Sequence, residues 1–130
     1  MRDSIDTADS LDKMVAQAGA ITAALMGNDA RKAMRPDLVS NLLWSIHDRL
    51  DDIAKAAYNA KFIDSDGLSD VSVNDDLDRL AAQAGAVTAA LMGNDAHKAM
   101  SPDLVSNLLW FVQDRLFDIG KVINGAKIAN

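Results

Sequence analysis

The chain has 130 residues, a net charge of −6, an apolar fraction of 49% and no cysteine. A chain of this length and composition is expected to fold as one domain around an apolar core, and the absence of cysteine excludes disulfides, thiolate metal ligands and a cysteine nucleophile. The negative charge argues against direct binding of nucleic acid and offers anionic lipid no basic patch.

The chain begins with an acidic stretch, residues 1–14, that lacks the apolar core of a secretory signal. Each later apolar run is too short to cross a bilayer. Absence of cysteine also fits a reducing compartment. We therefore expect a soluble, cytoplasmic protein that does not contact a membrane.

One stretch of the sequence occurs twice. Shifting the chain by 66 positions aligns residues 11–61 with residues 77–127 without a gap, and 36 of these 51 pairs are identical. Between residues 16–44 and 82–110 the agreement rises to 26 of 29 pairs. A unit of about sixty residues that occurs only twice is longer than the common helical repeats. It predicts two halves of one domain, related by approximate twofold symmetry.

Each half is expected to contain two helices joined by a short turn. In the first helix, apolar side chains recur at steps of three and four residues and form one seam, made of Leu11, Met14, Ala18, Ile21 and Leu25. Asp9 or Ser10 is a suitable N-cap for this helix. Gly27 and Asn28 are residues that tolerate a left-handed helix end. The segment that follows either extends the first helix by a turn or forms a short helix of its own.

The second helix of each half is expected to begin at a proline. Ser101 is a good N-cap before Pro102, whereas Arg35 is a weaker one before Pro36. The apolar seam then continues at the same steps through Val39, Leu43, Ile46, Leu50, Ile53, Ala57 and Ala60.

Two hairpins that are each apolar on one side can bury those sides against each other. The predicted fold is therefore all-α, a four-helix bundle built from two tandem αα-hairpins with approximate internal twofold symmetry. The single domain spans residues 1–130, with hairpin repeats at residues 5–61 and 75–127.

Residues 62–74 are the predicted linker between the hairpins. Gly67 and a high content of Asp and Ser disfavour a helix there, so the next helix is expected to start near residues 74–75. The run that starts at Asp64 begins like a calcium-binding loop, but its ligand pattern breaks at Leu68. An acidic linker without a bound metal is therefore expected.

The sequence contains no pattern that is typical of an active site or a metal centre. Di-iron bundles use glutamate ligands, and every acidic side chain of this chain is an aspartate. Neither His47 nor His97 is repeated in the other half, so we expect two surface histidines. Asp48 and Asp114 are repeated, but they are expected to form ordinary ion pairs one helical turn away. We predict no catalytic residue, no metal site and no cofactor.

The two tryptophans are the residues that the bundle does not explain. With 100° per residue and Ile46 at the middle of the buried face, Trp44 lies about 160° away, on the polar face. Trp110 takes the same place in the second half, Phe117 follows it along the same outward stripe, and Phe111 widens that stripe. Each tryptophan either folds over its own hairpin, packs against the other half, or belongs to a contact surface.

We expect a non-enzymatic interaction or regulatory module that contacts a protein, most simply a second copy in a homodimer, through Trp44, Trp110, Phe111 and Phe117. One alternative is an acidic inhibitor that mimics the charge of nucleic acid and blocks a nucleic-acid-binding protein, which requires the Asp side chains to gather on one face. A third possibility is a small-ligand binder or an enzyme, which requires a large apolar pocket with convergent polar groups.

Overall fold

The computed structural model describes residues 2–129 of the chain, and its described side chains are those of residues 6–27, 29–93 and 96–129. The elements follow in the order α1 (Arg2–Met26), α2 (Asn28–Ala33), α3 (Pro36–Asn59), β1 (Phe62–Ile63), α4 (Val71–Met92), η1 (Gly93–Lys98), α5 (Pro102–Gly125) and β2 (Lys127–Ile128). The short element η1 is a 3-10 helix. None of the described helices combines the length and the apolar character needed to span a membrane.

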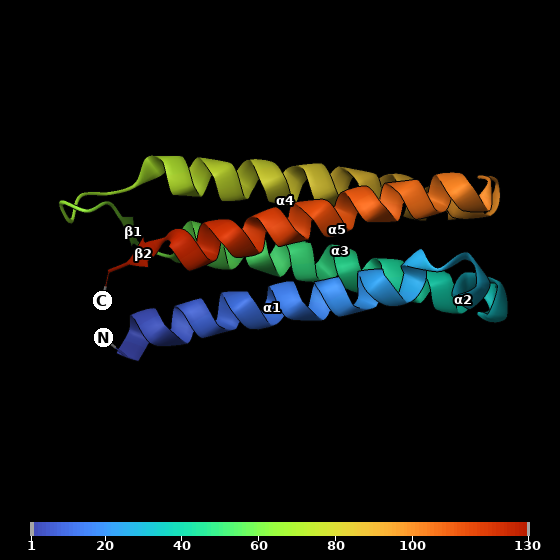
Figure 1. Ribbon diagram of the computed structural model, residues 1–130, viewed down its shortest axis with the longest axis horizontal. Coiled ribbons are helices and arrows are strands. Elements are labelled where there is room, and N and C mark those ends of the chain that lie inside the picture. The colour runs from blue at the N-terminus through green and yellow to red at the C-terminus, as the bar shows by residue number, and fades with distance from the viewer. Residues whose placement is uncertain (1, 130) are drawn as a thin grey trace.

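The four long helices run alternately in opposite directions and form a ring (Figure 1). α1 packs against α3 and α5, and α4 packs against the same two helices. α3 and α5 therefore occupy opposite corners of the bundle, and in Figure 1 α5 lies in front of α3, with α4 above and α1 below. The prediction of an all-α bundle of four long helices is confirmed, while its internal twofold symmetry stays a prediction.

The core is built from the apolar seams of the four long helices. α3 buries Val39, Leu43, Ile46, Leu50, Ile53 and Ala57, as predicted. α5 buries the equivalent set, made of Val105, Leu109, Val112, Leu116, Ile119 and Ile123. In α1, Leu11, Ala18 and Leu25 are completely buried, and so is Thr22. The Thr22 hydroxyl donates to the carbonyl of Ala18 at 2.7 Å, so this polar side chain is satisfied within its own helix.

The start of α5 agrees with the prediction from the sequence. The Ser101 hydroxyl accepts a hydrogen bond from the backbone N–H of Leu104 at 3.2 Å, which satisfies one of the free donors of the helix end. Arg35 holds the equivalent position before α3 and makes no side-chain cap. The two halves therefore differ in how firmly their second helix is capped.

Three other helix ends differ from the prediction. α1 begins at Arg2 rather than at Asp9 or Ser10, because residues with a capping preference are also tolerated inside an exposed helix. α4 begins at Val71, and not near residues 74–75, because the Asp70 carboxylate caps it. Gly27 has a φ of −73°, so the first hairpin does not use a left-handed helix end there.

Two short strands, which the sequence did not predict, close the end of the bundle opposite the hairpin turns (Figure 1). Phe62 pairs with Ile128 and Ile63 pairs with Lys127 in an antiparallel ladder. Phe62 is 3% exposed, and its carbonyl accepts a hydrogen bond from the N–H of Asp70 at 2.9 Å. The predicted linker is thus a compact loop that turns back at Gly67, where φ is +79°.

Candidate functional site

The predicted contact residues lie on the second helix of each hairpin, α3 or α5. Trp44 and Trp110 expose 56% and 55% of their surface, and Phe117 exposes 64%. Their direction follows from the helix period, since Ile46 and Val112, two residues after the tryptophans, are completely buried. The outward orientation predicted for both tryptophans is confirmed.

The structure does not bring the four predicted contact residues together. Trp110, Phe111 and Phe117 share α5, whereas Trp44 lies on α3, at the opposite corner of the bundle (Figure 1). A flat partner that covers Trp110 cannot reach Trp44 at the same time. The molecule therefore has two separate surfaces, the α5 face of Trp110, Phe111 and Phe117, and the α3 face around Trp44.

On the α5 face, a cation lies over each phenyl ring. The Nζ atom of Lys121 is 4.6 Å from the centre of the Phe117 ring, and the guanidinium of Arg115 is 5.0 Å from the centre of the Phe111 ring. Phe111 is half-buried. The exposed stripe therefore consists of Trp110 and Phe117, and Phe111 flanks it.

An apolar hollow of about 430 Å³, which we call the α1–α5 hollow, lies beside Phe117. Phe117 forms part of its wall, together with Val15 of α1 and Leu116 of α5. Gly19 and Gly120 also line it and fill none of it with a side chain, and a Cβ atom on Gly120 would come within 3.8 Å of Val15 Cγ1. The α5 face thus carries a projecting ring and a hollow side by side.

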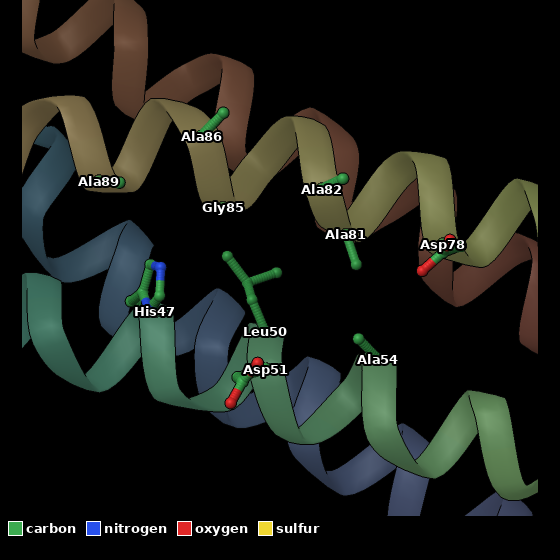
Figure 2. Close-up of a pocket in the computed structure, with 10 residues that line it drawn as sticks. All are labelled: His47, Leu50, Asp51, Ala54, Asp78, Ala81, Ala82, Gly85, Ala86 and Ala89. Carbon is green, nitrogen blue, oxygen red and sulfur yellow. The ribbon is translucent and has the colours of Figure 1, made fainter.

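The equivalent position of the other hairpin has a different chemistry. A groove of about 390 Å³, the α3–α4 groove, lies between α3 and α4. His47 and Asp51 line it from α3, and a row of alanines with Asp78 lines it from α4 (Figure 2). Asp51 stands where the second hairpin has Phe117, and its carboxylate pairs with Lys55 at 3.3 Å. The groove is therefore polar at the position where the α1–α5 hollow is apolar.

The α3 face combines aromatic and polar side chains. The rings of Trp44 and His47 meet edge to face, with their centres 6.2 Å apart and their planes at 71°. This contact covers part of Trp44 from within its own helix. Tyr58, near the end of α3, is 85% exposed.

The carboxylates supply a short acidic row rather than a continuous acidic face. Asp51, Asp75 and Asp78 line two neighbouring pockets along the α3–α4 side. Ion pairs occur on both sides, between Asp51 and Lys55 on α3 and between Asp118 and Arg115 on α5, each at 3.3 Å. The α3–α4 side, where the acidic row lies beside a groove, is the candidate surface for a charge mimic.

The prediction of two surface histidines is wrong for His97. Its side chain is buried, and its Nε2 atom lies 3.2 Å from the Ser40 hydroxyl of the other hairpin. Arg31 takes the equivalent place in the first hairpin and donates to the Pro102 carbonyl at 2.7 Å and to the Ser106 hydroxyl at 2.9 Å. Burial lowers the pKa of Arg31. Because Ser40 and Ser106 are equivalent, each hairpin reaches across to the same position of the other.

Among the described residues, no group of three or more His, Cys or acidic side chains is placed to hold a metal ion. The Asp64 carboxylate instead accepts hydrogen bonds from the N–H groups of Asp66 and Leu68, at 2.9 and 3.0 Å, and so shapes the linker turn.

Exposed aromatic rings and hollows are the features that distinguish this surface. Comparison with protein-family models, with curated proteins and with solved structures finds no match for this chain.

Proposed function

We propose that this chain is a non-enzymatic interaction module that forms a homodimer through the α5 face. One observation carries the proposal: Trp110 and Phe117 are each more than half exposed on α5, and Phe117 lines the apolar α1–α5 hollow. Exposed clusters of large aromatic side chains are typical of protein interfaces, in which aromatic residues are enriched.

A second copy of the chain is the partner that the shape of this face favours. A twofold dimer needs a self-complementary surface, on which a projection of one copy meets a hollow of the other and the reverse contact forms as well. The α5 face has both parts, since Phe117 projects beside the hollow that it lines. With the two α5 helices antiparallel, the rings of each copy enter the hollow of the other.

Charge also favours the α5 face over the α3 face. Two copies with a net charge of −6 repel each other, so they are expected to meet where acidic side chains are fewest. At the position of Phe117 the α3 face has Asp51, whereas Asp48 and Lys55 of the α3 face have equivalents on the α5 face, Asp114 and Lys121. The α5 face therefore has one carboxylate fewer. Salt at physiological strength screens the remaining repulsion beyond about 8 Å.

The buried area is sufficient to offset much of the cost of association. A large aromatic side chain has about 150–250 Å² to bury, so each half-exposed ring has about 100 Å² left. A dimer covers two copies of Trp110 and two of Phe117, about 400 Å² in all, which contributes about 10 kcal/mol. Association costs about 4–15 kcal/mol, and the side chains around the hollow supply the rest. We therefore expect a dimer that dissociates on dilution.

Sedimentation velocity tests the proposal. We expect the wild-type chain to sediment as a dimer and the Trp110→Ala, Phe117→Ala double variant as a monomer with unchanged helical circular dichroism. Trp44→Ala is the matched control, because Trp44 has the same exposure and the same place in the repeat but lies on the opposite corner. This control should remain a dimer. A monomeric wild type, or a double variant that still dimerises, would overturn the proposal.

The cytoplasm is the compartment that we propose for this dimer, because a chain without cysteine suits a reducing environment.

The charge mimic remains the second candidate, supported by the acidic row of Asp51, Asp75 and Asp78. It predicts that a basic protein binds the α3–α4 side, that Asp→Asn changes in the row abolish binding, and that affinity falls steeply with salt. A contact through the α5 face should instead persist in high salt, because apolar burial drives it.

A further inference from the structure

A cavity of about 310 Å³, the turn-end cavity, lies at the end of the bundle where the hairpins turn, beside the starts of α3 and α5. The first hairpin lines it with Arg31, Lys32, Met34, Pro36 and Val39, and the second hairpin lines it with the residue 66 positions after each of these. Both halves of the chain therefore contribute the same five positions to one site.

The lining combines an apolar interior with basic side chains. The two valines are buried, and Met34 and Met100 are partly buried against the core. Lys32 and Lys98 are exposed at the mouth. Among the described lining residues, each side chain that can carry a charge is basic. In a chain with 19 acidic and 13 basic residues, this local composition is the reverse of the average.

Cross-hairpin contacts give this cavity a fixed shape. Arg31 is hydrogen-bonded to Pro102 and Ser106 at the start of α5, and His97 is hydrogen-bonded to Ser40 of α3. The first turns of α3 and α5 also border the cavity, but each carries an aspartate, Asp37 or Asp103, that offsets its positive helix end. The positive charge at the cavity therefore comes from its basic side chains.

We propose that the turn-end cavity binds a small amphipathic anion, namely a carboxylate that carries a short hydrocarbon chain. The methionines and valines cover the hydrocarbon, and Lys32 and Lys98 hold the carboxylate at the mouth. The volume lies at the lower end of the range of about 300–1,000 Å³ found for ligand pockets, which restricts the ligand to a small molecule. Octanoate is a suitable probe of this class.

Titration with octanoate, followed by NMR of the chain labelled in its methionine methyl groups, tests the site directly. We expect the methyl signals of Met34 and Met100 to shift and those of Met14, Met26 and Met92 to stay. Octanol has the same chain without the charge and should bind about tenfold more weakly, and octylamine should bind still more weakly because its charge is reversed. Shifts spread over all methionines, or equal binding of the three probes, would overturn the proposal.

A pair of matched variants separates this site from general attraction to positive charge. Lys32→Gln with Lys98→Gln should lower the affinity for octanoate about tenfold or more, because both carboxylate contacts are lost. Lys61→Gln with Lys127→Gln removes the same charge from another pair of exposed lysines 66 positions apart, at the strand end of the bundle, and should leave binding unchanged. Equal affinities of the two double variants would refute the assignment.

The outcome is distinguishable from that of the homodimer experiment. The turn-end cavity shares no lining residue with the α5 face, and the proposed octanoate contacts lie within one chain. Octanoate binding is measured by NMR and dimerisation by sedimentation of the same samples. Each proposal fails when its own double variant keeps the property, and the other property of the same sample shows whether the second proposal still holds.

Discussion

Arg31 joins the two hairpins at the turn end, so its removal is expected to destabilise the bundle. Its guanidinium donates to the carbonyls of Leu25 and Met26 at the end of α1. It also donates to the carbonyl of Pro102 and to the hydroxyl of Ser106 at the start of α5. One side chain thereby satisfies two carbonyls that a helix end leaves without an intrahelical partner and connects α1 to α5.

We expect Arg31→Ala to lower the free energy of unfolding by about 2–4 kcal/mol. A hydrogen bond from a charged donor contributes about 1.5–3 kcal/mol, but the four contacts share one side chain and are not additive. Arg31 is also only partly buried, so water replaces some of these bonds in the variant. The expected loss is therefore close to the value of one or two such bonds.

Urea unfolding followed by far-ultraviolet circular dichroism measures this change. Protein concentration has to be the same throughout, because dimerisation shifts the apparent stability. Arg35→Ala is the matched control, since Arg35 lies in the same turn, is exposed, and makes one surface ion pair with Asp37 at 3.5 Å. It should change the free energy of unfolding by less than about 0.5 kcal/mol. Equal stabilities of the two variants would refute the role assigned to Arg31.

Further predictions concern the α3 face, the helix caps and the linker. Asp51→Phe gives the α3 face the phenyl ring that the α5 face has at the equivalent position. Each chain then has contact surfaces on two opposite corners of the bundle, so we expect sedimentation velocity to show species larger than a dimer. A sedimenting species of unchanged size would contradict this. Ser101→Ala should lower the free energy of unfolding by about 1 kcal/mol, and Arg35→Ser should raise it by up to about 1 kcal/mol by adding the missing cap, both measured by urea unfolding. Gly67→Ala should cost about 1 kcal/mol in the same assay, because a φ of +79° disfavours a Cβ atom.

The long helices and their buried sides were predictable because both depend on local patterns. A step of three and four residues between apolar side chains placed Ile46 in the core and Trp44 outside it, and the structure agrees. Ser101 before a proline was a sufficient signal for the start of α5. The start of α4 was less predictable, because Asp70 is one of several acidic residues in the linker and only its geometry makes it the cap.

Features that depend on contacts between distant segments were not predictable. The strand pair joins residues 64 and 66 positions apart, and each strand has only two residues, too few for a period to show. His97 was expected at the surface, yet the neighbouring hairpin covers it. One signal was available, since positions 31 and 97 differ within a stretch that is otherwise almost identical between the halves.

The candidate site was predictable in its residues but not in its arrangement. The period of each helix shows which ring points outward, but it does not show which helices are neighbours. Only the ring order of the bundle separates Trp44 from Trp110. Likewise, Gly19 and Gly120 define a hollow because α1 and α5 pack together, and neither glycine signals this contact alone.

The central claim is that a homodimer covers the α5 face and leaves the α3 face exposed. Because the chain has two tryptophans, Trp44→Phe leaves Trp110 as the sole reporter, and Trp110→Phe leaves Trp44. Tryptophan emission and its quenching by acrylamide, measured while the chain is diluted through dimer dissociation, compare the two faces directly. We predict that the emission of Trp110 shifts to the red and its quenching increases on dilution, while Trp44 shows no change. A change at Trp44 alone, or at neither tryptophan, would contradict the claim.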